Sequence, residues 1–144
     1  MIGYATVGTN DLERARAFYD ALFAEIGGRR VMQFDETGFT MYGTGKRAPG
    51  VAVTRPHDGG AASPGNGAMI AIGVDARAKV DALHGRAMEL GGSDEGAPGL
   101  RGPEGDRAFY GAYFRDLDGN KFCAFCIGPQ PHWGGPDESE RAGD

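Results

Sequence analysis

An internal repeat constrains this chain of 144 residues more than any other feature of its sequence. Shifting the sequence by 65 positions places Tyr4 on Met69, Gly8 on Gly73 and Phe18 on Leu83. After one gap, "AEIGG" also aligns with "MELGG". A copy this short cannot close a hydrophobic core alone, so the repeat predicts two units that pack against each other. The alternative is a coincidence of two amphipathic helices that both end in Gly-Gly.

The first copy has the pattern of a strand, a helix and three more strands. Residues 3–9 alternate like a strand. Apolar residues at helical spacing then predict a helix, which Asn10 or Asp11 can cap and Gly27-Gly28 can end. Three short strands are expected after it, at residues 29–35, 38–44 and 50–56.

The second copy follows a linker rich in helix and strand breakers at residues 57–67. A strand is expected at residues 68–74, followed by a helix at residues 75–92 that Asp75 caps. Residues 97–107, "APGLRGPEGDR", are interpreted as a loop. The remaining predicted strands lie at residues 106–116 and 121–128.

These elements predict one domain of two βαβββ modules in residues 1–127. The modules span residues 1–56 and 68–127, and a C-terminal tail follows at residues 128–144. The predicted fold class is α+β, a cupped mixed sheet with helices on its outer face and a concave face open to a ligand. Its 26 glycines are scattered at turns, which suits a sheet protein rich in turns.

Charge and composition exclude several classes of function. A net charge of −5 without a basic cluster argues against nucleic acid as a partner. No apolar run approaches the roughly 20 residues that span a bilayer, so no membrane association is expected. The first residues lack the basic start and apolar middle of a signal peptide, and the chain has two cysteines. We therefore expect a cytoplasmic protein.

Four features together resemble a known family. They are the opening "IGYATVGTNDLERARAFYDAL", the duplicated module, the helix "VDALHGRAMELGG" and the segment "YFRDLDGNKFCAF". On these residues the chain resembles the glyoxalase, bleomycin-resistance and extradiol-dioxygenase superfamily, which has the vicinal oxygen chelate fold, over residues 1–127. The resemblance implies paired βαβββ modules, often assembled as a homodimer whose pockets use both chains.

The resemblance also implies where a metal would bind. Metal-dependent members place histidine on the first strand of each module and glutamate on the last strand. Here the two histidine positions hold Tyr4 and Met69, the glutamate position holds Cys123, and a possible fourth position holds Ala52. Divalent ions prefer imidazole and carboxylate ligands, and a phenol or thiol binds well only as an anion. We therefore expect no metal site and no cofactor.

Both cysteines lie in the motif "CAFC". Residues three apart on a strand point to opposite faces, so Cys123 and Cys126 should not form a disulfide with each other. The motif also lacks the helix N-terminus that activates redox Cys-x-x-Cys pairs. If Cys123 faces the cup, Cys126 faces the outer helices. Both cysteines can be inert packing residues, and a reactive Cys123 thiolate is the alternative.

Aromatic and basic residues form the candidate binding site. Alternation places Phe109 and Tyr113 on one face of their strand and Tyr110 with Phe114 on the other, and leaves open which face lines the cup. Arg101 lies in the predicted loop and could hold a carboxylate or another anion. The predicted ligand-binding residues are Tyr4, Tyr42, Met69, Arg101, Phe109, Tyr113 and Cys123. Alternatively, the aromatic side chains fill the cup and no ligand binds.

The three histidines are interpreted separately. His57 lies in the linker and is expected to be solvated, and His84 on the second helix is expected to have a structural or interface role. His132 stands beside Trp133 in the polar tail, where the "PHW" segment either frays or docks on the body or on a second subunit.

The sequence is compatible with three functions. The first is metal-independent binding of a small organic molecule in the cup. The second is an enzyme of the superfamily, a lactoylglutathione lyase-like lyase or a dioxygenase with an offset metal site, or a metal-free catalyst that uses Tyr4 or Cys123. The third is a dimeric interaction protein whose cup is filled. The acidic net charge suits a cationic ligand, whereas Arg101 suits an acid, so the charge of the ligand is open.

Overall fold

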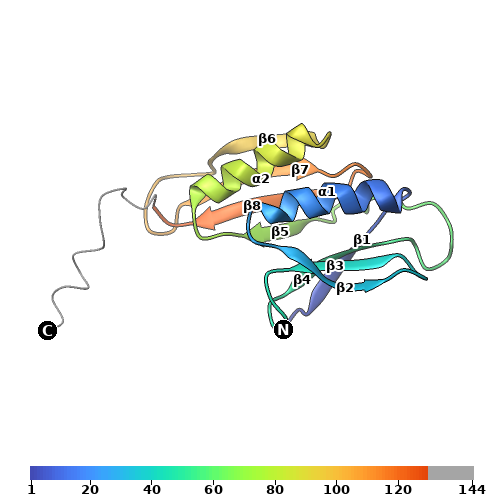
Figure 1. Ribbon diagram of the computed structural model, residues 1–144. Coiled ribbons are helices and arrows are strands. Elements are labelled where there is room, and N and C mark those ends of the chain that lie inside the picture. Colours follow the sequence, from blue (N-terminus) through green and yellow to red (C-terminus); the bar gives the residue numbers. More distant parts are fainter. Residues whose placement is uncertain (130–144) are drawn as a thin grey trace, which may run out of the picture.

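The computed structural model describes residues 1–129 and contains two modules of the same build (Figure 1). The first module consists of β1 (Tyr4–Gly8), α1 (Leu12–Ala24), β2 (Arg29–Phe34), β3 (Phe39–Gly43) and β4 (Gly50–Thr54). The second consists of β5 (Ile70–Gly73), α2 (Arg77–Glu89), β6 (Ser93–Leu100), β7 (Phe109–Arg115) and β8 (Lys121–Ile127). The predicted pair of βαβββ modules is confirmed.

Each module folds into a four-stranded mixed sheet. Sheet A has the strand order β1-β4-β3-β2, and sheet B has the equivalent order β5-β8-β7-β6. The first strand of each module runs parallel to the last strand, and the other neighbours are antiparallel. Within residues 1–129 no strand of sheet A pairs with a strand of sheet B. The α+β fold class is therefore confirmed, with two separate sheets in the chain.

The two helices begin differently. The side chain of Asp11 caps α1, because its Oδ1 accepts a hydrogen bond of 3.2 Å from the backbone N–H of Arg14. The prediction that Asp75 caps α2 is wrong. Ala76 occupies the N-cap without a side-chain bond, and the Asp75 carboxylate instead binds the Lys79 ammonium at 2.6 Å. No helix in the described part of the chain is long and apolar enough to span a membrane.

One core joins the modules. The helices lie next to each other on the same side of the molecule, α1 against sheet A and α2 against sheet B (Figure 1). Leu22 of α1, Leu83 of α2 and Phe122 of β8 are fully buried in a single hydrophobic cluster. The ring of Tyr19 on α1 lies 5.9 Å from that of Phe122, so the first helix also packs on the second sheet.

Strand β6 corrects the prediction of a loop at residues 97–107, since residues 97–100 belong to the strand. Its sequence contains Gly96, Pro98 and Gly99, which disfavour strands. The strand forms because it is the outer strand of sheet B, where proline is tolerated, and pairs with β7 through two irregularities of register.

Tyrosine hydroxyls show which face of each sheet the helices cover. Tyr42 on β3 donates to Asp20 of α1 at 2.9 Å, and Tyr110 on β7 donates to Asp81 of α2 at 2.7 Å. Side chains alternate along a strand, so the neighbours of these tyrosines point the other way. We call the side opposite the helices the open face of each sheet.

Candidate functional site

The open face of sheet B carries most of the predicted site. Tyr113 on β7 is paired in register with Cys123 on β8, and both lie on this face. Phe109 lies on the same face and stacks on Phe125 with ring centroids 5.3 Å apart. The structure thus places Phe109 and Tyr113 on the open face, the point that the sequence left undecided.

Cys123 and Cys126 point to opposite faces of β8. Cys126 shares the helix face with Tyr110, its partner in register. Both thiols are free and buried, and Cys123 is only 1% exposed. Burial raises the pKa of the Cys123 thiol, and this effect outweighs the opposing influence of Arg101 and Lys121. The thiol therefore has the character of a packing residue rather than of an activated nucleophile.

Two cations flank the Tyr113 ring. The guanidinium carbon of Arg101 lies 5.5 Å from the ring centroid, and the Lys121 ammonium lies 5.6 Å from it. Sequence reasoning found Arg101 and missed Lys121. The missed signal was simple, because Lys121 stands two residues before Cys123 on one strand and must share its face.

The open face of sheet A is aromatic and apolar. Tyr4 contacts Phe39 with ring centroids 5.6 Å apart, and Phe39 lies 6.0 Å from Phe34. Ala52 lies on the same face but is completely buried, so larger neighbouring side chains cover it. Tyr4 and Phe34 themselves are 54% and 55% exposed. The first module thus presents exposed rings around a filled centre.

Tyr42 does not share this face with Tyr4, which corrects its predicted place in the cup. Its side chain is 2% exposed, and its hydroxyl binds Asp20 and the backbone carbonyl of Arg16. Burial and then the Asp20 carboxylate raise the pKa of the Tyr42 phenol. Tyr42 instead borders an apolar pocket of about 590 Å³ between the helix face of sheet A and β5. Its neighbours indicate a structural role.

The four positions where related metal sites have ligands do not suit a divalent ion. Tyr4 and Ala52 lie on the open face of sheet A, Cys123 lies on that of sheet B, and Met69 directly precedes β5. They offer a phenol, a methyl group, a buried thiol and a thioether. Within residues 1–129, no three His, Cys, Asp or Glu side chains gather in a way that could hold a metal ion.

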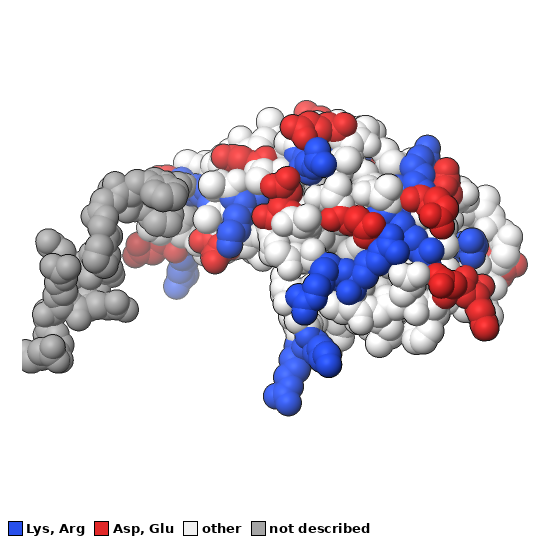
Figure 2. All heavy atoms as spheres, in the orientation of Figure 1, with Lys and Arg blue, Asp and Glu red and all other residues white. Residues whose placement is uncertain are grey.

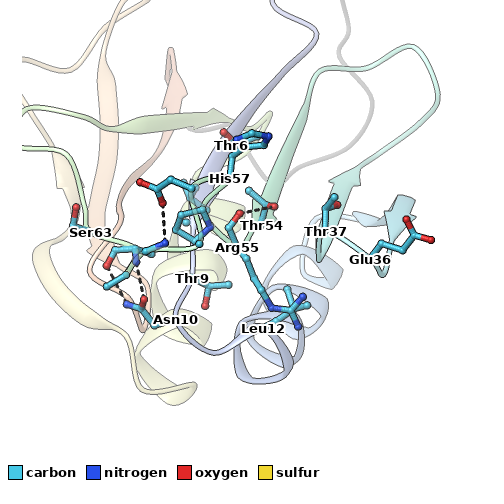
Figure 3. Close-up of a pocket in the computed structure, with 18 residues that line it drawn as sticks. Thr6, Thr9, Asn10, Leu12, Glu36, Thr37, Thr54, Arg55, His57 and Ser63 are labelled. Carbon is cyan, nitrogen blue, oxygen red and sulfur yellow. Dashed lines mark hydrogen bonds between the residues drawn. The ribbon is translucent and has the colours of Figure 1, made fainter.

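A broad hollow lies at the carboxyl ends of β1 and β4. Its volume is about 940 Å³, and the linker from Pro56 to Ser63 forms one wall. The His57 ring and the Arg55 guanidinium point to different ends of this hollow, and Arg55 extends toward Leu12 (Figure 3). The two basic side chains therefore do not converge on one ligand group.

A smaller hollow borders the open face of sheet B. Its volume is about 530 Å³, and it is lined by linker residues 64–68 together with Met69, Arg115 and Lys121. Met69 and Lys121 bring this hollow next to the Tyr113 cluster. A volume of this size suits a small organic molecule.

Neither His57 nor His84 lies on the open face of a sheet. His57 is exposed, as expected, and His84 binds Asp94 of β6 through its Nε2 at 2.9 Å. That contact gives His84 the expected structural role between α2 and β6. His132 and Trp133 lie outside the described residues.

Comparison with known proteins identifies the family. The family model of the Glyoxalase/Bleomycin resistance protein/Dioxygenase superfamily matches residues 1–124. The chain belongs to this superfamily. It is similar to the crystal structure of a glyoxalase/bleomycin resistance protein from Albidiferax ferrireducens T118, with 34% identity and a TM-score of 0.75. That similarity covers 88% of this chain and 98% of the other.

More distant members of the superfamily share the fold. A glyoxalase-related enzyme from Fulvimarina pelagi is 22% identical, with a TM-score of 0.63 over 88% of this chain and 87% of the other. A superfamily member from Sphaerobacter thermophilus DSM 20745 is 19% identical, with a TM-score of 0.60 over 88% of this chain and 96% of the other. No protein with a curated description matches the chain.

Proposed function

We propose that this superfamily member binds a small organic molecule on its open faces without a metal ion. The observation that carries the proposal is the chemistry at the four ligand positions, Tyr4, Ala52, Met69 and Cys123. None of them offers the imidazole or carboxylate that a divalent ion prefers. Around Cys123 the sheet instead presents aromatic rings and two cations, a lining that suits an organic ligand.

We further propose that a second copy of the chain completes the site. Large apolar side chains on or beside the open faces are exposed in the single chain, namely Tyr4 (54%), Met32 (45%), Phe34 (55%), Met69 (45%) and Ile127 (55%). Exposed apolar clusters of this kind mark interaction surfaces. If the open face of sheet A on one copy meets that of sheet B on another, Tyr4 and Tyr113 line one shared pocket.

Binding without chemistry is the role that the titratable groups favour. The buried Cys123 has a raised pKa, so little thiolate is available near neutral pH. A lyase or dioxygenase of the superfamily would need an ion at another place. Two free thiols suit a reducing compartment, which supports a cytoplasmic location.

A second candidate function is a dimeric interaction protein with filled open faces. The contacts of Tyr4 and Phe34 with Phe39, together with complete burial of Ala52, favour it for sheet A. The hollow beside Lys121 and Met69 distinguishes the two candidates, because a filled face would leave no room there.

Fluorescence of the neutral dye N-phenyl-1-naphthylamine tests the proposal, since its emission rises in an apolar site. We expect saturable binding with one site per chain, and weaker binding to Tyr113→Ala. The matched control is Tyr110→Ala, which removes a tyrosine from the helix face of the same strand. Absence of saturable binding to the wild-type protein would reject the binding function and favour the interaction protein.

A further inference from the structure

Two cations, Arg101 and Lys121, lie next to one aromatic ring, that of Tyr113. On the helix side, acidic and basic side chains are interleaved (Figure 2), and pairs such as Arg30 with Asp20 form ion pairs. Arg101 and Lys121 form no ion pair within residues 1–129. Two cations next to one aromatic ring therefore lack an anion.

Glu95 is a carboxylate that Lys121 influences, and it already binds Arg115. Lys121 contributes to the lowered pKa of Glu95, but the main cause is the hydrogen bond from Arg115. The Arg115 Nε donates to Glu95 at 2.6 Å, and its Nη1 donates to the carbonyl of Gly119 at 2.8 Å. Arg115 and Glu95 thus neutralise each other and leave the charge of Lys121 uncompensated.

The guanidinium of Arg101 is held in a defined position. Its Nη1 donates to the carbonyl of Gly99 at 3.0 Å, and its Nη2 donates to that of Ala97 at 2.7 Å. These bonds use two of the five N–H groups of an arginine, so others remain for a ligand. A Cβ atom at Gly96 would lie 3.1 Å from Nη2, so the missing side chain leaves room for the guanidinium. The backbone carbonyls of Gly99 and Ala97 therefore hold the Arg101 guanidinium in position without a ligand.

The hollow next to Lys121 has a basic lining, which suits an anion. Residues 64–69, Arg115 and Lys121 line it, and this lining contains no aspartate or glutamate. The larger hollow at the end of β1 differs, because Glu36 and Asp58 line it together with Arg55 and His57. An anion should therefore bind in the hollow beside Lys121 rather than in the larger hollow, where carboxylates would repel it.

We infer that the ligand of this site is an aromatic organic anion, with a carboxylate or sulfonate at Lys121 in the hollow, the charge of Arg101 adding to the attraction, and its aromatic body next to Tyr113. This inference rests on the proposed function and adds the chemical class of the ligand. It also resolves the charge of the ligand, for which the acidic net charge and Arg101 pointed in opposite directions. The local charge at the site, not the net charge of the chain, decides which ligand is attracted.

Two dyes that differ only in the anionic group test the inference. 8-Anilinonaphthalene-1-sulfonate is N-phenyl-1-naphthylamine with an added sulfonate. We expect the wild-type protein to bind the sulfonate about tenfold or more tightly than the neutral dye at low salt. Arg101→Gln and Lys121→Gln should each weaken sulfonate binding about five- to tenfold and leave binding of the neutral dye within about twofold.

Arg47→Gln and Lys46→Gln are the matched controls, because both cations lie in the β3–β4 turn and neither lines the hollow beside Lys121. Neither control should change the affinity for the sulfonate by more than about twofold. Equal affinity for the two dyes, or equal losses in the site and control variants, would overturn the inference while the binding function stands. No saturable binding of either dye would reject the binding function itself. Retained binding of the neutral dye shows that a variant is folded.

Discussion

The hydroxyl of Tyr19 donates a hydrogen bond to a carboxylate oxygen of Asp116, which joins α1 of the first module to the β7–β8 turn of the second. Both side chains are buried, Tyr19 at 1% and Asp116 at 5% exposure. Nearby, Thr9 donates to Asp118 at 2.7 Å and Asn120 donates to the carbonyl of Gly8 at 3.0 Å. The turn that most resembles the superfamily therefore fastens the two modules together.

Removing the Tyr19 hydroxyl should destabilise the protein. Asp116 would keep its bonds from the backbone and side chain of Asn120 and from the Asp118 backbone, but would lose its donor from the first module. We expect Tyr19→Phe to lower the free energy of unfolding in urea by about 1–3 kcal/mol. The control is Tyr110→Phe, whose bond to Asp81 is exposed, with an expected loss within about 0.5 kcal/mol. Equal losses in both variants would contradict the role of the Tyr19 bond.

The raised pKa of Tyr19 leads us to expect a loss of folding stability at alkaline pH. Burial, followed by the Asp116 carboxylate, raises the pKa of Tyr19 well above its ordinary value of 10.0. Above pH 10 the unfolded chain releases the phenol proton while the folded chain retains it, so stability falls as pH rises. One such group contributes a slope of up to about 1.4 kcal/mol per pH unit. Urea unfolding between pH 9 and 11 should show a shallower decline in Tyr19→Phe, and an identical decline would contradict the assignment.

The importance of the position of the Arg101 guanidinium can be tested without removing its charge. A Cβ atom at Gly96 would lie 3.0 Å from Cδ2 of Tyr113 and 3.1 Å from the Arg101 Nη2, so both side chains must move. We expect Gly96→Ala to weaken sulfonate-dye binding several-fold. In Gly85→Ala, by contrast, the new methyl group meets no atom within 4 Å. That change in α2 should leave the affinity unchanged and raise stability by about 0.5–1 kcal/mol. Unaltered affinity in Gly96→Ala would show that the position of Arg101 does not matter.

The proposed dimer makes a separate prediction. Phe34 is 55% exposed on the open face of sheet A, and a carboxylate there would oppose burial in an interface. Sedimentation analysis should give a dimer for the wild-type protein and a monomer for Phe34→Asp at the same concentration. Leu100→Asp is the control, since Leu100 pairs with Tyr110 of the helix face and is also exposed. A monomeric wild-type protein would reject the dimer, as would equal dissociation of both variants.

Apolar periodicity predicted the fold well, because it reports which face of an element is buried. Leu12, Phe18 and Leu22 recur at helical spacing, and all three are buried in α1. Strand β6 escaped prediction because glycine and proline obscure its pattern, and only pairing with β7 makes it a strand. Local sequence could not reveal that partner.

The candidate site was predicted less completely, for reasons of strand geometry. Phe39 and Tyr42 are three residues apart on β3, so they point to opposite faces by the rule that separates Cys123 from Cys126. Applying that rule to β3 would have shown that at most one of the two lines the cup. Applying it to β8 would have added Lys121. The hydrogen bonds from Arg101 to the carbonyls of Gly99 and Ala97 depend on the backbone path of β6. They could not be predicted from the sequence.

The most direct test of metal-independent binding is sulfonate-dye titration of protein purified without chelator, before and after dialysis against EDTA, with elemental analysis of both samples. Tyr4, Ala52, Met69 and Cys123 supply no imidazole or carboxylate, so we predict far less than one divalent ion per chain and the same dye affinity in both samples. One tightly bound divalent ion per chain, with dye binding lost in EDTA and restored by that ion, would contradict the account.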